Sequence, residues 1–204
     1  MIRVLCVDDH RLIREGIARI IGLQPDMTVV AQASNGKEAI DQFLACRPDV
    51  TLMDLQLPTL SGLDALRAVR EAEPDAKVVM LTMYYGDEDI HRAFEAGARG
   101  YLLKDMLPDD LIRVIREVQN GRRVVPPEVA AALEQRASQP VLTTRELQVL
   151  ELLATGMSNK EIAAALGIRS DTAGAHIKSI FAKFAVHDRV AALREGVRRG
   201  IIHM

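Results

Sequence analysis

Five polar side chains, each following an apolar run, are the residues in this sequence that could do chemistry together. They comprise three carboxylates, one hydroxyl and one ammonium group: Asp8, Asp9, Asp54, Thr82 and Lys104. Carboxylates gathered at one place repel one another, so such a cluster is typical of a cation site, and oxygen ligands of this kind suit Mg²⁺. The hydroxyl and ammonium groups suit the oxygens of a phosphoryl group. The set therefore predicts a magnesium site that can hold a phosphoryl group.

Two simpler explanations stay open for these residues. Asp54 is expected to follow a strand directly, and an Asp at such a position often stabilises a turn by hydrogen bonding to the backbone. The whole set could also form a solvated rim on which Lys104 neutralises one carboxylate. The metal-site hypothesis requires the fold to bring the five side chains together, so it depends on the elements that carry them.

The apolar runs before these residues have the pattern of parallel strands. The run Val50–Met53 is short and nearly all apolar, which is typical of a strand buried on both faces. Similar runs cover residues 3–7, 29–33, 78–81 and 101–103, and helical periodicity covers residues 11–23, 36–45, 62–71, 88–96 and 108–119. This alternation predicts an α/β fold with a five-stranded, doubly wound parallel sheet. The five side chains should then converge at the carboxyl edge of the sheet, where ligands bind in such folds.

The composition indicates a globular protein of the reducing cytoplasm. The chain has 204 residues, of which 49% are hydrophobic and 26% are charged. Arg3, Asp8 and Asp9 interrupt the start before a secretory signal could form, and no apolar run approaches the roughly 20 residues that span a bilayer. Two cysteines are too few for a disulfide framework or a zinc site. We therefore expect a cytoplasmic protein with no membrane partner.

The chain from residue 141 onward carries signals of a second, smaller, all-α domain. It holds 9 Lys/Arg against 6 Asp/Glu, while the first 140 residues carry a net charge of −5, so nucleic acid is the expected partner of the tail. Capping boxes at Thr143–Glu146 and Ser158–Glu161 each open an amphipathic helix. Further helices are expected near residues 170–184 and 189–199. This arrangement favours a helix-turn-helix, with a generic four-helix bundle as the alternative.

The first part of the chain resembles the receiver domain of two-component response regulators. The resemblance rests on V-D-D-H, M-D-L-x-x-P-x-x-x-G, L-T and G-Y-L-L-K, which begin at Val7, Met53, Leu81 and Gly100. It implies a flavodoxin-like fold, a sensor histidine kinase as partner, and a role in regulation rather than as an enzyme. By this resemblance Asp54 is the phosphoacceptor, and Thr82 and Lys104 bind the phosphoryl oxygens. Tyr101 is the aromatic switch. The implied Mg²⁺ ligands are Asp9, Asp54 and the carbonyl of Gln56, with Asp8 acting through water. Met83 and Tyr84 would shield the acyl phosphate or simply pack.

The tail resembles the LuxR-type helix-turn-helix through L-T-x-R-E, S-N-K-E-I-A and K-F-x-V-x-x-R, which begin at Leu142, Ser158 and Lys183. The whole chain is thus similar to NarL/FixJ-type response regulators, with a receiver domain over residues 1–121, a linker with a short helix over 122–140, and a DNA-binding domain over 141–204. The resemblance implies double-stranded DNA as a partner and a homodimer on phosphorylation. The expected DNA-binding residues are Lys160, Arg169, Thr172, Gly174, Ala175, Lys178 and Lys183.

The recognition helix departs from this family. Ala173-Gly174 stands where Val-Lys is usual, and Arg169 replaces the usual Ser before the helix, so its cap is expected to shift to Ser170. Gly174 and Ala175 have almost no reach toward a base. The departure leaves an alternative open, a receiver-gated protein-interaction regulator that reads DNA weakly or not at all. A phosphatase with paired carboxylates is disfavoured, because it needs D-x-D spacing at a strand end.

Overall fold

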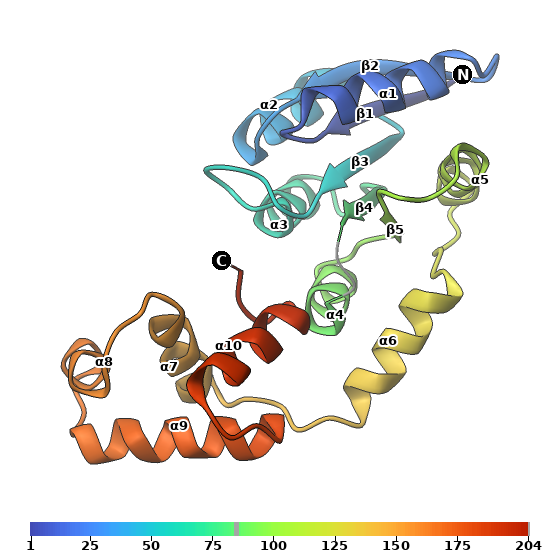
Figure 1. Cartoon of the computed structure of the whole chain (residues 1–204). Helices are drawn as coiled ribbons and strands as arrows, with labels where there is room; N and C mark the ends of the chain where they lie inside the picture. The colour runs from blue at the N-terminus through green and yellow to red at the C-terminus, as the bar shows by residue number, and fades with distance from the viewer. Residues whose placement is uncertain (84–85, 204) are drawn as a thin grey trace. The chain divides into compact units, whose positions relative to one another are not determined.

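The computed structural model describes residues 1–83 and 86–203, and the chain folds as two compact units. Within these residues, the first unit comprises residues 1–83 and 90–130, and the second comprises residues 86–89 and 131–203. Figure 1 shows the first unit as a sheet with helices around it and the second as a group of helices. Each unit has its own hydrophobic core.

The first unit contains a parallel sheet in the order β2-β1-β3-β4-β5. Its strands are β1 (Ile2–Val7), β2 (Met27–Ala33), β3 (Val50–Asp54), β4 (Val78–Thr82) and β5 (Gly100–Leu103). Every residue of β3, β4 and β5 is buried, because helices cover both faces of the sheet. The predicted five-stranded, doubly wound parallel sheet is confirmed.

In the part of the chain that the structure describes, five helices alternate with the strands, and the first three residues of the fourth helix fall in the second unit. The helices are α1 (Arg11–Gly22), α2 (Gly36–Cys46), α3 (Gly62–Ala72), α4 (Asp87–Glu95) and α5 (Pro108–Gln119). Ile21 of α1 and Ile115 of α5 share one core with Leu52 of β3, so α1 and α5 cover the same face. α2 and α3 pack beside each other. The register places Asp54 beside Leu81, and Thr82 beside Leu103, so the strand ends align along one edge.

The second unit is helical, as predicted. Its helices are α7 (Thr144–Ala154), α8 (Asn159–Leu166), α9 (Ser170–Phe184) and α10 (Arg189–Arg198), while α6 (Pro127–Ala137) crosses the boundary between the units. Both capping boxes are present, at Thr143 and at Ser158, which confirms the predicted starts of α7 and α8. α8 ends at Gly167 in the left-handed conformation, and α9 packs against both α7 and α8. This is the predicted helix-turn-helix order.

The predicted cap of α9 at Ser170 is wrong. The helix begins at Ser170, so Arg169 is the N-cap, with an extended backbone and no side-chain capping bond among the described residues. The carbonyl of Arg169 already accepts the first helical bond, from the amide of Ala173 at 3.0 Å. The turn after Gly167 therefore fixes where α9 starts. Arg169 in place of the usual Ser removes the side-chain cap but leaves the N-cap position unchanged.

Among the described residues, no helix combines the length and the apolar composition needed to cross a membrane.

Candidate functional site

A lysine ammonium group joins two buried carboxylates at the carboxyl edge of the sheet. The Nζ atom of Lys104, just after β5, lies 2.7 Å from Oδ2 of Asp54 and 2.8 Å from Oδ2 of Asp8. Asp8 is fully buried and Asp54 is 3% exposed. Lys104 does pair with carboxylates, as the rim alternative expected, but Lys104, Asp8 and Asp54 are buried and not solvated.

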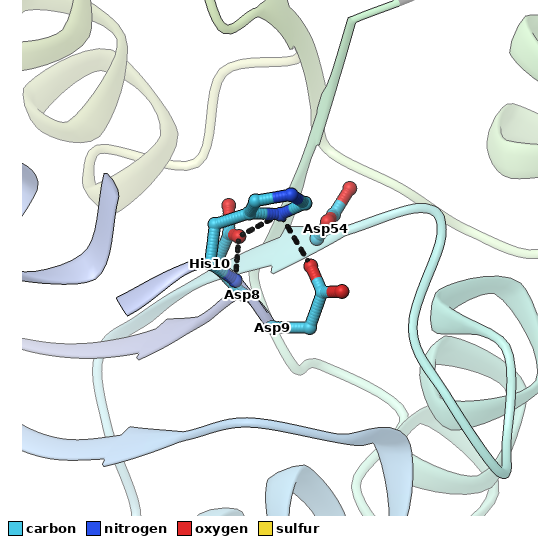
Figure 2. Close-up of side chains that lie close together, drawn as sticks. All are labelled: Asp8, Asp9, His10 and Asp54. Carbon is cyan, nitrogen blue, oxygen red and sulfur yellow. Dashed lines mark hydrogen bonds and ion pairs between the residues drawn. The ribbon is translucent and has the colours of Figure 1, made fainter. Parts of the chain in front are cut away.

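Two further side chains complete an acidic cluster at this edge (Figure 2). One ligand atom from each of Asp8, Asp9, His10 and Asp54 lies within 4.8 Å of the other three. The Nδ1 atom of His10 is 2.6 Å from Oδ1 of Asp9 and 3.5 Å from Oδ1 of Asp8. Three carboxylates at such separations fit a hard divalent cation. The residues that the sequence predicted to bind Mg²⁺ through side chains are therefore together, with Asp9 more exposed than the other two.

His10 is a further member of the cluster and was not among the predicted site residues. It belongs to the motif V-D-D-H, and its position directly after two aspartates is the signal that could have identified it. Its backbone amide donates to Oδ1 of Asp8 at 2.8 Å, so the turn after β1 also orients that carboxylate.

Burial and hydrogen bonding act against each other at Asp54. Burial is the largest influence and raises the pKa of this carboxyl group, and the nearby charge of Asp8 raises it further. The hydrogen bond and charge of Lys104 and the amide of Gln56 lower the pKa. The net pKa of Asp54 lies above its usual range. Burial would lower the pKa of Lys104, but its bonds to Asp54 and Asp8 outweigh burial and raise it. Lys104 therefore stays charged. The negative charge of Asp54 is only partly compensated by its neighbours, so a further cation beside it would be favourable.

The peptide after Asp54 orients its carboxylate and constrains the next helix. The amide of Gln56 donates to Oδ1 of Asp54 at 3.2 Å. Gly62, the first residue of α3, lies so close that an added Cβ would be 1.8 Å from the carbonyl oxygen of Asp54. A glycine is therefore required at position 62, and the motif M-D-L-x-x-P-x-x-x-G contains it for this reason.

The two remaining predicted receiver residues lie on β4 and β5. Thr82 is buried at the end of β4, and its carbonyl accepts a bond from the amide of Lys104 at 2.8 Å. Tyr101 of β5 is fully buried, with its ring centroid 6.3 Å from that of Phe94 in α4. Met83 is 62% exposed, which disfavours packing, and Tyr84 lies outside the described residues.

The expected DNA-binding residues lie mostly on the exposed surface of α8 and α9. The side chains of Lys160, Arg169, Thr172, Ala175 and Lys178 are exposed, and Gly174 is half-buried. Arg169 is 3.6 Å from Asp171, and both side chains extend almost fully into solvent. Lys183 differs from the others, because its ammonium group lies 2.6 Å from Oε2 of Glu146 and 2.9 Å from the carbonyl oxygen of Val141.

Two family models match the chain. Residues 4–116 match the response regulator receiver domain, and residues 140–195 match the luxR family of bacterial regulatory proteins. The nitrate/nitrite response regulator protein homolog of Haemophilus influenzae is 41% identical over 195 residues, covering 94% of each chain. The transcriptional regulatory protein LnrK of Bacillus subtilis is 36% identical over 217 residues, covering 98% of this chain and 99% of that protein. The crystal structure of the response regulator ChrA, from a heme-sensing two-component system, aligns with a TM-score of 0.59 and 39% identity over 98% of both chains.

Proposed function

The chain belongs to the two-component response regulators of the LuxR family, and on this premise we propose that transfer of a phosphoryl group to Asp54 controls its binding to double-stranded DNA. The observation that supports this is the contact of Lys104 with both Asp54 and Asp8 beside an acidic cluster. The phosphate donor is a phosphohistidine on a sensor histidine kinase. The protein acts in the cytoplasm as a regulator and not as an enzyme.

Asp54 is the nucleophile. One carboxylate oxygen attacks the phosphorus atom of the phosphohistidine, the P–N bond breaks, and the imidazole nitrogen keeps the electron pair. The bonds from Gln56 to Oδ1 and from Lys104 to Oδ2 orient the carboxylate before the donor arrives. When bound by Asp9, Asp54 and the carbonyl of Gln56, with Asp8 acting through water, Mg²⁺ supplies charge that offsets the phosphoryl oxygens.

The phosphoryl group acts as a switch because neighbouring polar side chains form new bonds to its oxygens. The Lys104 ammonium and the Thr82 hydroxyl bind phosphoryl oxygens, and Tyr101 is the aromatic switch that responds. Each bond to a charged group contributes about 1.5–3 kcal/mol. Two such bonds are comparable to the roughly 5.5 kcal/mol that reverses a population from 1:99 to 99:1. Both partners are therefore needed for full activation.

DNA binding is assigned to the second unit. The match of residues 140–195 to the luxR family favours DNA over a protein-interaction role. The proposed contacts are Lys160 of α8, Arg169 before α9, and Thr172, Gly174, Ala175 and Lys178 of α9, with Lys178 as the main base contact because Gly174 and Ala175 carry no side-chain donor. Within the chain we propose a receiver domain over residues 1–121, a linker over 122–140 and a DNA-binding domain over 141–204. The family models at residues 4–116 and 140–195 support these limits.

We propose a homodimer on DNA after phosphorylation, formed through α10. Val190 is 67% exposed and Val197 is 39% exposed, so α10 presents apolar side chains that the core of its own unit leaves uncovered. Two copies of a helix-turn-helix on a two-fold axis would match two half-sites.

The test of phosphorylation is mass measurement after incubation with a small phosphodonor. We expect an adduct of about 80 Da, one phosphoryl group, that requires Mg²⁺ and disappears in Asp54→Ala. An adduct of the same size in Asp54→Ala would contradict the assignment. Asp49→Ala is a matched control that should keep the adduct. The Asp49 carboxylate accepts a hydrogen bond from the amide of Arg3 and is outside the acidic cluster.

A further inference from the structure

A buried carboxylate in the second unit makes more hydrogen bonds than its helix cap requires. Glu146, in the first turn of α7, is 4% exposed. Its Oε2 atom accepts from the amide of Thr143 at 2.7 Å, and the Thr143 hydroxyl oxygen accepts from the amide of Glu146 at 3.3 Å, which together form the capping box. These two bonds account for one end of α7 only.

The same carboxylate also binds two side chains of α9. The hydroxyl of Ser179 donates to Oε1 at 2.6 Å, and the ammonium group of Lys183 donates to Oε2 at 2.6 Å. Ser179 and Lys183 are four residues apart, so they project from the same face of α9. Lys183 further donates to the carbonyl of Val141 at 2.9 Å. Glu146 thus fixes α9 to the start of α7 at two successive turns.

The charge of Glu146 is strongly stabilised. Burial would raise its pKa, but the bonds from Lys183, Ser179 and Thr143 lower it from 4.5 to about 2. The carboxylate therefore stays ionised at neutral pH, and loss of Lys183 would leave a buried negative charge without its ion-pair partner.

We propose that Glu146 is a positioning residue for the recognition helix and that Lys183 serves this carboxylate and does not contact DNA phosphate. The inference rests on the proposed DNA binding by α9. Lys178 is adjacent in sequence to Ser179, so the rotation of α9 about its own axis decides where Lys178 points. By holding Ser179 and Lys183, Glu146 sets that rotation. The positive charge of Lys183 is already neutralised inside the protein, so it releases few counterions when DNA binds.

The salt dependence of DNA binding distinguishes a phosphate contact from a positioning role. We would measure the affinity of the full-length protein for a random-sequence duplex as a function of salt, for wild type, Lys183→Met and Lys178→Met. A random-sequence duplex offers Lys178 no cognate base, so there its ammonium group pairs with phosphate, and Lys178→Met should reduce the slope of log affinity against log salt by about one unit. Lys183→Met should weaken binding several-fold at every salt concentration and leave the slope unchanged. A slope that falls by about one in Lys183→Met, as in Lys178→Met, would overturn the proposal.

Two further variants keep the test valid where Lys183→Met folds poorly. Lys183→Arg keeps the positive charge and a hydrogen-bond donor, so it should bind DNA with wild-type affinity and wild-type salt dependence. Glu146→Gln combined with Lys183→Met removes both charges and should be more stable to heat than Lys183→Met alone. If wild type shows no salt-dependent binding, the proposed DNA function fails, and thermal unfolding alone then decides the inference. Additive effects of Glu146→Gln and Lys183→Met on unfolding would contradict the positioning role.

Discussion

The ammonium nitrogen of Lys104 lies 2.7 Å from a carboxylate oxygen of Asp54, although the two residues are 50 positions apart in the chain. Lys104 also binds Asp8 at 2.8 Å, so in this structure one ammonium group pairs with two buried carboxylates and leaves a net negative charge. A phosphoryl group on Asp54 would compete for the same ammonium group. In the proposed mechanism, Lys104 is therefore already beside Asp54 before the phosphoryl group arrives.

Replacing Lys104 should separate phosphorylation from activation. Lys104→Ala leaves Asp54 in place, so the protein should still gain one phosphoryl group. One bond worth about 1.5–3 kcal/mol is lost, so phosphorylation should raise DNA affinity by a factor at least ten smaller than in wild type. DNA affinity measured with and without the phosphodonor tests this. Normal activation of Lys104→Ala would show that the switch does not depend on this contact.

Neutralising Asp54 should stabilise the protein in the absence of Mg²⁺. Burial raises the pKa of Asp54 in the folded state above its unfolded value. The folded state therefore binds the proton more tightly than the unfolded chain, and stability falls as the pH rises through the window between the two values. At neutral pH the ionised group is destabilising, so Asp54→Asn should raise the melting temperature. Mg²⁺ should stabilise wild type and reduce this difference.

Acid should unfold the second unit through Glu146. The pKa of Glu146 is lowered to about 2, so its contribution is present above the unfolded value of 4.5 and is lost as the pH falls toward 2. Because solvent screens part of this interaction, the shift corresponds to at most about 3 kcal/mol. Far-ultraviolet circular dichroism with a denaturant titration at each pH measures the loss. Glu146→Gln should flatten this part of the profile, and an unchanged profile would show that other carboxylates control acid unfolding.

Replacing Gly62 should disrupt the phosphorylation site. A Cβ at position 62 would be 1.8 Å from the carbonyl oxygen of Asp54, so Gly62→Ala must displace the strand end or α3. We expect slower phosphorylation and a clear loss of stability. Gly16→Ala is the matched control: a Cβ there meets nothing within 4 Å, and the alanine should stabilise α1 by about 0.5–1 kcal/mol. Equal effects of the two variants on phosphorylation would contradict the steric argument.

Adding a lysine to the recognition helix should strengthen DNA binding. A Cβ on Gly174 would meet only the side chain of Asn159 at 3.9 Å, so the fold has room for a side chain there. Gly174→Lys should tighten binding and steepen its salt dependence by about one unit. Gly174→Ala is the control, because it restores helix propensity, about 1 kcal/mol, without adding charge. If Gly174→Ala gives the same gain and the same change of slope, the added lysine makes no phosphate contact.

An acidic residue on α10 should prevent dimer formation on DNA. Val190 is 67% exposed, so Val190→Asp should leave the unfolding free energy of the monomer nearly unchanged while placing a charge in the proposed interface. Sedimentation of the phosphorylated chain with a two-half-site duplex should change from two proteins per duplex to one. Leu44→Asp, at an exposed position of α2, should behave as wild type. A one-to-one complex for wild type would argue against the dimer.

The amino-acid sequence by itself determined the elements and their order. The apolar runs around Leu52 and Met80 and the capping boxes at Thr143 and Ser158 are signals within a few residues of the chain, and the structure places strands and helices there. The convergence of Asp8 with Asp54 followed as well, because all parallel strands present their carboxyl ends at one edge.

Only the tertiary structure decided which partner each charged side chain takes. Residue type and spacing placed Lys183 among the basic residues of α9, but its ammonium group contacts Glu146, which lies 37 residues earlier. The same holds for His10, which the turn after β1 places against Asp9, and for Lys104, which reaches Asp8 as well as Asp54. A charge count records how many ionic groups a segment carries, whereas the direction of each side chain depends on the helix and strand packing around it.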